Sequence, residues 1–336
     1  MKKNKYSIIL PVRNGGEYIK LCVKSILAQS IQNFDLQIFE NRSTDGTYEW
    51  LNTLHDDRIK IYPAEKNLSI EENWARIKEI PKNEFITLIG HDDMLDEHYL
   101  ATMDALINKH PSATLYQSHF RYIDAAGMEI KKCRPMKEQY NETEYLEAIL
   151  TNTLDTMGTG YMMRSKDYDK LGGIPSHPNL LFADHELWIR LTGLGYMAVS
   201  ATEGFSYRLN QSVSKISGAS KYIDAFYLFL DFLTKLREKD NAIADTISAT
   251  IRGYIHFYCK SLAHRLLKTP QSQRNSKTLG VFINTCNSKL NELAPEFKFN
   301  LMSDPDIRLA SFIDSNSILR SLYLLFRKFY SKPIYS

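Results

Sequence analysis

Two acidic residues, Asp92 and Asp93, directly follow the apolar run 85–89, which is typical of a buried strand. Adjacent carboxylates at the end of a buried strand repel each other and lose solvation, so they need a cation or strong hydrogen-bond donors nearby. Mg²⁺ is typically held by one or two protein carboxylates together with substrate phosphates. Helix capping is the alternative, because acids are favoured near a helix N-terminus. We expect Asp96 to be such a cap and the pair Asp92 and Asp93 to bind a divalent metal ion.

Another acid, Asp184, stands at the start of a pattern typical of an amphipathic helix. A helix that begins near Asp184 would place Leu187, Trp188 and Leu191 on one buried face. Asp184 itself would lie in the first turn, at the surface or in a cleft. Two roles remain open for it at this point, that of a helix cap and that of a general base.

A carboxylate and an amide, Glu40 and Asn41, follow the second predicted strand. Side chains of this kind at the end of a strand can hydrogen-bond the edge of a nucleotide base. The alternative is an ordinary connection from strand to helix, in which Ser43 or Asp45 caps the helix and Gly46 relieves the turn.

Short strands and helices alternate through the first hundred residues and would position these side chains. The pattern predicts strands over 7–12, 34–39, 59–62 and 85–89, and helices over 17–29, 47–54, 69–80 and 96–110, with a capping box at Ser69 and Glu72. Such alternation predicts an α/β fold with a parallel sheet covered on both faces. Ligands bind at the carboxyl ends of strands in such sheets, so the loops after Val12, Phe39 and Ile89 are candidate sites.

The chain changes character near residue 215. Beyond it the pattern predicts only helices, over 222–239, 242–268 and 318–332, with a polar linker over 271–277. We therefore expect two domains, 1–215 and 216–336. The first carries 25 Lys and Arg against 29 Asp and Glu, and the second 17 against 10. An acidic first domain argues against nucleic-acid binding there, whereas the basic second domain could meet phosphates or anionic lipid.

Several common classes of protein are excluded by missing signatures. The chain has no G-x-G-x-x-G, no G-x-x-x-x-G-K-[ST] and no H-E-x-x-H motif. Its four cysteines form no C-x-x-C pair, and its basic N-terminus lacks the apolar core of a signal peptide. No run approaches the ~20 apolar residues of a membrane span. We expect a cytoplasmic protein.

Taken together, these segments resemble family 2 glycosyltransferases with the GT-A fold. The resemblance rests on S-I-I-L-P-V-R-N at 7–14, E-N-R-S-T-D-G-T at 40–47, G-H-D-D at 90–93 and A-D-H-E-L-W-I-R-L at 183–191, with support from Gly172-Gly173 and from Y-R-L-N-Q-S-V-S at 207–214. It covers roughly residues 5 to 215. It implies a Rossmann-like nucleotide-diphospho-sugar transferase domain with a mostly parallel central sheet, followed by an α-helical region.

The resemblance also implies roles for individual residues. Pro11 and Arg13 would line the nucleotide base pocket, and Asn67 and Asn73 would lie beside the donor. Asp92 would contact the ribose or the metal ion.

The remaining implied roles concern the ion and the reaction. Asp93 would bind the divalent ion, Mn²⁺ or Mg²⁺, that bridges the donor diphosphate, and Asp184 would be the catalytic base.

Four residues depart from the family pattern. Glu40-Asn41 replaces the usual pair of aspartates, so the identity of the nucleotide base stays open. Gly90 stands where many relatives have the first acid of D-x-D, and Asn210 replaces a histidine. The ion would therefore depend mainly on the phosphates of the donor.

The resemblance implies an inverting, non-processive enzyme that transfers one sugar from a nucleoside-diphosphate sugar, with UDP as the expected nucleotide. The acceptor would be a glycan or a lipid-linked glycan in bacterial O-antigen or capsule synthesis. The chain lacks the Q-x-x-R-W motif of processive synthases. Two alternatives are a catalytically degenerate subunit that binds nucleotide sugar or glycan, and a sugar-phosphate nucleotidyltransferase, whose Gly-rich phosphate loop is missing here.

The last 22 residues, 315–336, contain no acidic residue, and basic side chains alternate there with aliphatic and aromatic ones. A helix of this composition could lie on the inner face of the cytoplasmic membrane, where lipid-linked acceptors occur. It could equally pack on the first domain or on a second copy of the chain.

Overall fold

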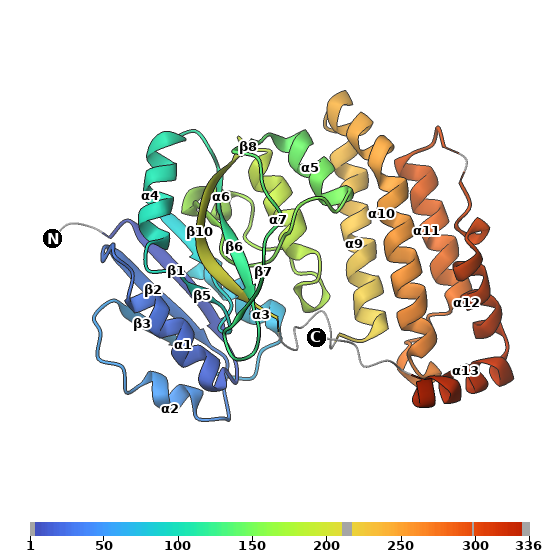
Figure 1. Ribbon diagram of the computed structural model, residues 1–336, viewed down its shortest axis with the longest axis horizontal. Helices are drawn as coiled ribbons and strands as arrows, with labels where there is room; N and C mark the ends of the chain where they lie inside the picture. Colours follow the sequence, from blue (N-terminus) through green and yellow to red (C-terminus); the bar gives the residue numbers. More distant parts are fainter. Residues whose placement is uncertain (1–3, 210–216, 298, 331–336) are drawn as a thin grey trace. The chain divides into compact units, whose positions relative to one another are not determined.

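The computed structural model describes residues 4–209, 217–297 and 299–330 (Figure 1). Close backbone contacts divide the chain into two compact units. The first, called the sheet unit below, comprises residues 1–145, 153–176 and 183–210, and the second, the helical unit, comprises 146–152, 177–182 and 211–336. Two short segments expected in the first domain, 146–152 and 177–182, thus group with the helices. The functional division at residue 215 stays a prediction.

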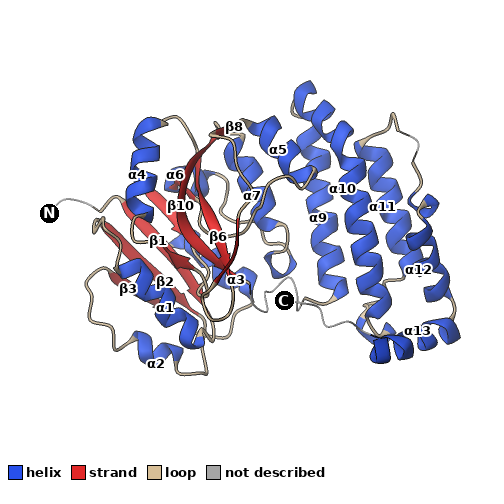
Figure 2. Ribbon diagram, viewed as in Figure 1, coloured by secondary structure: helices blue, strands red, loops and turns tan. Residues whose placement is uncertain are grey.

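All strands in the described ranges belong to the sheet unit, where they form one mixed sheet (Figure 2). Their order is β3-β2-β1-β4-β9-β6-β10-β5, with β7 beside β6 and β8 beside β10. The strands are β1 (Tyr6–Val12), β2 (Phe34–Glu40), β3 (Ile59–Pro63), β4 (Phe85–Leu88), β5 (Met94–Leu95), β6 (Leu115–Ile123), β7 (Glu129–Lys132), β8 (Gln139–Tyr140), β9 (Met162–Arg164) and β10 (Met197–Arg208). The first four strands are parallel, as predicted, and β6 also runs parallel to β10.

The four predicted strands agree with the structure to within about one residue at each end. Every residue of β1 and β2 is buried, which explains why their sequences read as continuous apolar runs. In the register of this pair Val12 lies opposite Glu40, so the two strands end side by side. The loops that follow them therefore start at the same edge of the sheet.

Helices of the sheet unit follow the predicted order along the chain. They are α1 (Gly16–Leu27), α2 (Thr47–Leu51), α3 (Ile70–Ala75), the 3₁₀ turn η1 (Arg76–Glu79), α4 (Tyr99–Lys109), α6 (Ser165–Lys170) and α7 (Ala183–Thr192), and α5 (Glu142–Leu150) crosses the division between the units. The capping box at Ser69 and Glu72 is present and starts α3 as predicted.

The prediction that Asp96 caps a helix is wrong. The helix α4 begins at Tyr99, and residues 94–95 form the short strand β5 instead. The carboxylate of Asp96 is taken by an ion pair with Arg121, a residue of β6. The guanidinium of Arg121 gives this carboxylate a charged hydrogen-bonding partner in place of the helix N-terminus.

The helical unit consists, in its described part, of α9 (Ala219–Arg237), α10 (Asn241–Lys268), α11 (Leu279–Leu293), α12 (Pro305–Ser315) and α13 (Ser317–Tyr330) (Figure 1). The same unit contains three 3₁₀ turns, η2 (Pro178–Leu180), η3 (Gln271–Gln273) and η4 (Leu301–Ser303). The helices α9, α10 and α13 were predicted, whereas α11 and α12 were not. No helix in these described ranges is both long and apolar enough to cross a bilayer.

An aromatic cluster fills the core of the helical unit. The ring of Phe182 lies 5.7 Å from Phe229 in a stacked arrangement and 5.6 Å from Phe226, and Tyr254 and Tyr258 extend the cluster along α10. Phe182 has a positive φ of 61°, a conformation that a phenylalanine adopts only at a cost. Burial of its ring in this cluster offsets that cost.

Candidate functional site

The loops after β1 and β2 are joined by hydrogen bonds at the carboxyl edge of the sheet. The Asn14 side chain accepts the N–H of Thr44 at 2.8 Å, and the N–H of Asn14 donates to Ser43 Oγ at 2.9 Å. Asp45 accepts the N–H of Gly16 at 2.9 Å, which ties α1 to the second loop. The edge expected to bind a ligand is therefore held in one arrangement by its own side chains.

In the turn before α2, Asp45 and Ser43 have different hydrogen-bond partners. Asp45 accepts the N–H of Thr47 at 3.1 Å and so serves the helix N-terminus, whereas Ser43 is occupied by the first loop. Gly46 has a φ of 88°, which agrees with the prediction that it relieves this turn.

Glu40 and Asn41 are buried, and the backbone takes up their polar atoms. Glu40 accepts the N–H groups of Arg42 at 3.2 Å and Ser43 at 2.6 Å. The amide of Asn41 donates to the carbonyl of Leu68 at 3.0 Å and accepts the N–H of the same residue at 2.9 Å. In this arrangement both side chains hold the backbone of the loops at this edge of the sheet.

The other residues with an implied donor role divide into buried and exposed ones. Pro11 is buried within β1, and Asn73 is buried and donates to the carbonyl of Phe39 at 3.1 Å. Arg13 and Asn67 are exposed. Of these four, only Arg13 and Asn67 have side chains at the surface where a donor could reach them.

Asp93 is buried, with 2% of the residue exposed. One carboxylate oxygen accepts the backbone N–H of Arg208 at 2.9 Å, and the other accepts the hydroxyl of Thr159 at 2.7 Å. Burial raises the pKa of Asp93 well above its usual range, and the nearby charge of Asp92 raises it further. Asp93 therefore joins three distant segments of the chain beneath the site.

The guanidinium of Arg208 binds the loop that carries Asp92 and Asp93. Its Nε donates to the carbonyl of Asp92 at 2.8 Å, and Nη1 donates to the carbonyl of Asp124 at 2.8 Å. The group also lies 4.6 Å from the ring centre of Tyr18, in the geometry of a cation–π contact. A buried arginine with these partners fixes the backbone that carries Asp92.

A turn with two glycines, Gly158 and Gly160, lies between Asp184 and the loop that carries Asp92 and Asp93. The middle residue, Thr159, binds Asp93, and a Cβ on Gly158 would lie 3.8 Å from a carboxylate oxygen of Asp184. The N–H of Gly160 donates to the carbonyl of Leu88, the last residue of β4, at 2.9 Å. The turn thus lies against both acids.

Tyr207 connects the two groups of acids electrostatically. Burial raises its pKa above the ordinary value, and the negative charges of Asp93, Asp92 and Asp184 raise it further. Together with the contacts of the turn 158–160, this brings acids about 90 positions apart in sequence to one region of the sheet unit.

The helix that carries Asp184 agrees with its prediction. It is α7, and Leu187, Trp188 and Leu191 are fully buried along one face. The indole N–H of Trp188 donates to the carbonyl of Met157 at 3.0 Å, which anchors the helix to the glycine-containing turn. Asp184 lies in the first turn and is partly exposed.

The acids present suit a metal ion that is held mainly by its substrate. No group of three or more His, Cys, Asp or Glu side chains that could hold a metal occurs in the described ranges. Asp93 is buried, whereas Asp92 is partly exposed at the same edge. One carboxylate together with phosphate oxygens fits the coordination that Mg²⁺ prefers. Asp92 is thus better positioned than Asp93 to be a ligand.

Sequence reasoning did not identify Thr159 or the part that Tyr207 and Arg208 play at the site. Residues 207 and 208 belonged to a quoted motif, but their spacing gives no sign of their partners. The paired glycines around Thr159 were the available signal of a tight turn. The remainder of that motif, from Asn210 to Ser214, lies outside the described residues.

Comparison with known proteins identifies the family of the sheet unit. Residues 7–172 match the model of glycosyl transferase family 2. The chain thus carries a family 2 glycosyltransferase domain.

Curated relatives are glycosyltransferases of low identity. The chain is 24% identical over 123 residues to the glycosyltransferase GlyG of Streptococcus pneumoniae, which is 36% of this chain and 41% of GlyG. It is 22% identical to an uncharacterised glycosyltransferase of Rickettsia typhi, over 78% of this chain and 81% of the relative. The chain thus spans about two fifths of GlyG.

Solved structures with a similar fold include S. aureus TarS, with a TM-score of 0.60 and 12% identity over 92% of this chain and 55% of TarS. TarS 1–349 in complex with UDP-GlcNAc gives a TM-score of 0.57 and 14% identity over 96% of this chain and 92% of that one. The mannosyltransferase PcManGT of Pyrobaculum calidifontis, in complex with GDP-Man and Mn²⁺, gives 0.51 and 13% over 98% and 89%. These likenesses identify the fold of the sheet unit as GT-A.

Proposed function

We propose that the chain is an inverting, non-processive glycosyltransferase that moves one sugar from a nucleoside-diphosphate sugar to a hydroxyl group of a glycan or lipid-linked glycan. The observation that carries this proposal is the turn 158–160, in which Thr159 donates to Asp93 at 2.7 Å and a Cβ on Gly158 would lie 3.8 Å from a carboxylate oxygen of Asp184. One acid is available for the acceptor and another for the donor side.

The reaction is a single displacement at the anomeric carbon. Asp184 accepts the proton of the acceptor hydroxyl while that oxygen forms a bond to the anomeric carbon, and the bond from that carbon to the diphosphate oxygen breaks. The position of Asp184 in the first turn of α7, with partial exposure, suits this role.

On the donor side, Asp92 is the proposed ligand of a divalent ion, and Asp93 holds Asp92 in position through Arg208 and Thr159. When bound, Mn²⁺ or Mg²⁺ would neutralise the charge that develops on the leaving diphosphate. Arg13 and Asn67, both exposed, are proposed to contact the nucleotide and the sugar. Pro11, Glu40, Asn41 and Asn73 are proposed to shape that pocket from beneath.

The donor is proposed to be a UDP-sugar, because the similar structure of TarS 1–349 contains UDP-GlcNAc. The test is a calorimetric titration of the protein with UDP, dTDP, GDP and CDP, each with and without Mn²⁺ or Mg²⁺. Metal-dependent binding of UDP supports the proposal, and the same dependence on GDP would replace UDP by the nucleotide found with PcManGT. A folded protein that binds none of the four supports the degenerate alternative.

The acceptor is proposed to belong to a bacterial surface polysaccharide, since the curated relatives are bacterial glycosyltransferases. Loss of the gene in its host should then shorten or remove one such glycan, while purified protein and the matching donor should restore the missing sugar in an extract. An unchanged glycan profile would contradict this role.

Contact with a membrane surface is proposed through α13. Four large apolar residues lie on one face of it and are exposed, Ile318, Leu322, Leu325 and Phe326. We call these four residues the α13 face. A surface helix with such a face lies in the interface of a bilayer, with its apolar side among the acyl chains.

Basic residues occur on α13 and near its partner helix. Arg327 of α13 directly follows Phe326 of the α13 face in sequence, and its charge contributes to lowering the pKa of Lys268 on α10, which burial lowers most. Anionic lipid would offset these positive charges. We therefore propose an anionic bilayer as the partner of the α13 face, with a second copy of the chain as the alternative outcome of the test.

A further inference from the structure

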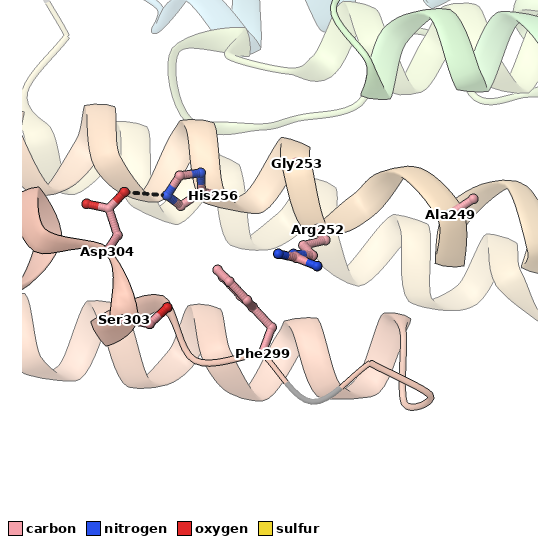
Figure 3. A pocket seen from close by; sticks show the side chains of 7 residues that line it. All are labelled: Ala249, Arg252, Gly253, His256, Phe299, Ser303 and Asp304. Atoms are coloured by element: carbon pink, nitrogen blue, oxygen red, sulfur yellow. Dashed lines mark hydrogen bonds and ion pairs between the residues drawn. The ribbon is translucent and has the colours of Figure 1, made fainter.

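A pocket of about 400 Å³ lies within the helical unit, between α10 and the segment that leads into α12 (Figure 3). Its wall on α10 is formed by Arg252, Gly253 and His256, with Ala249 one turn earlier. The opposite wall contains Phe299, Ser303 and Asp304. A volume of this size falls in the range of small-molecule sites, about 300–1,000 Å³.

Arg252 supplies a cation that has no acidic partner in the described ranges. Its guanidinium lies 4.4 Å from the ring centre of Phe299, so the aromatic face fixes the plane of the group. Stacking on an aromatic ring leaves the N–H edges of an arginine available for hydrogen bonds. Figure 3 shows the guanidinium extending along the pocket toward His256. A fixed guanidinium of this kind suits a planar or tetrahedral oxyanion.

His256 is oriented by Asp304. Its Nε2 lies 2.7 Å from one carboxylate oxygen of Asp304, and the other oxygen accepts the N–H groups of Asp306 and Ile307 at 2.8 and 3.1 Å. These contacts lower the pKa of Asp304, the backbone bond from Ile307 most. Asp304 thus keeps its negative charge, which is directed at His256 and at the N-terminus of α12. Arg252 carries the positive charge among the residues that line the pocket.

Gly253 makes the floor of the pocket. It lies in the interior of the 28-residue helix α10, where glycine costs about 1 kcal/mol relative to alanine. No atom lies within 4 Å of the position that a Cβ would occupy, and the helix does not need a positive φ there. Neither packing nor backbone conformation therefore requires glycine. An open floor beside Arg252 gives a reason for it.

We infer that this pocket binds the phosphoryl group of a phosphorylated sugar or polyol. Arg252 meets the phosphoryl oxygens, Ser303 and His256 lie at the same opening as additional polar groups, and the carbon skeleton lies over Gly253 and beside Phe299. The volume exceeds that of a bare phosphate ion, which is why an ester is favoured over the free anion. This site belongs to the helical unit alone and does not depend on the donor site of the sheet unit.

The test uses the full chain and calorimetric titration with glycerol 3-phosphate, inorganic phosphate and glycerol. We expect glycerol 3-phosphate to bind, inorganic phosphate to bind at least fivefold more weakly, and glycerol not to bind. Equal binding of both phosphates would contradict the assignment to an ester, and absence of binding would overturn the site. Saturation with UDP and Mn²⁺ should leave this binding unchanged, which separates it from the donor site.

Two variants localise the binding. Arg252→Met keeps the aliphatic part of the side chain but removes its charge, and Gly253→Val fills the open space above Gly253. Each variant should reduce affinity for glycerol 3-phosphate at least tenfold. Arg308→Met on α12 removes an equally exposed arginine outside the pocket and should have no effect. Thermal melting of each variant checks that it is folded. An equal loss in the Arg308 variant would show binding by net charge and overturn the proposal.

Discussion

Asp92 and Asp93 are neighbours in sequence but differ in what surrounds their carboxylates. Replacement of Asp93 by alanine leaves the N–H of Arg208 and the hydroxyl of Thr159 without an acceptor. An unsatisfied buried group costs about 1–3 kcal/mol, so we expect a clear fall in melting temperature. Asp92→Asn should weaken metal-dependent binding of the diphosphate and lower the melting temperature less, because Asp92 is partly exposed. Thermal melting and nucleotide titration of both variants test this division, and it fails if the two effects are exchanged.

For the reaction itself, Asp184→Asn is the informative change. Loss of a general base typically lowers the rate by about 10²–10⁴, whereas nucleotide affinity should stay within a factor of two. The measurement is transfer of radiolabelled sugar together with nucleotide titration. Glu186→Gln serves as the control, because Glu186 lies in the same helix. Full activity of the Asp184 variant would remove the assignment, and loss in the Glu186 variant alone would move the role of base to that residue.

At the scale of elements, the sequence predicted best what depends on neighbouring residues. Interior parallel strands are buried on both faces, so β1 and β4 read as apolar runs with ends correct to about one residue. Asp96 was misassigned because its partner Arg121 lies 25 residues away, and a long-range ion pair leaves no local trace. For the same reason, the sequence could place Asp92 and Asp93 just after the end of β4. Their approach to Tyr207 could not be predicted, because it depends on how β10 joins the sheet.

Two glycines with a positive φ, Gly160 before β9 and Gly172 after α6, differ in how much room an added Cβ would have. Gly160 has a φ of 78°, and an added Cβ would lie 2.5 Å from the ring of Phe205. Gly172 has a φ of 84° but no atom within 4 Å. Gly172→Ala should therefore cost roughly 1–2 kcal/mol from the left-handed conformation alone. Gly160→Ala should cost about 1–3 kcal/mol more, because the core is overpacked. Denaturant unfolding measures both, and equal losses would mean that Phe205 moves aside freely.

At the scale of the whole molecule, the two units carry opposite charge. The range 1–215 has a net charge of −4, and 216–336 has +7, by counts of Lys and Arg against Asp and Glu. A nucleotide sugar is itself an anion, so the acidic unit relies on individual residues such as Arg13 and on a cation to bind it. The basic unit carries both the pocket at Arg252 and the basic residues of α13. Anionic partners are therefore expected mainly on the helical unit.

The last prediction concerns binding of the α13 face to a membrane surface. The double variant Leu322→Ser and Phe326→Ser removes two apolar side chains that are 55% and 58% exposed. Burial of one such side chain in an apolar phase is worth about 1.5–3 kcal/mol, so binding to vesicles rich in phosphatidylglycerol should fall at least tenfold. Wild-type binding should weaken in phosphatidylcholine vesicles and at high salt, because the basic residues of α13 are screened.

The matched control for that experiment lies in the sheet unit. Met128→Ser with Ile130→Ser removes two apolar residues that are 68% and 49% exposed, and vesicle binding should not change. Sedimentation equilibrium of the same variants decides between the two partners of the α13 face. If wild-type protein forms a dimer that the Leu322 and Phe326 variant cannot form, and neither protein binds vesicles, the face joins two copies of the chain. Vesicle binding by a monomeric wild type, lost in that variant alone, assigns the face to the membrane because only the lipid then remains to cover it.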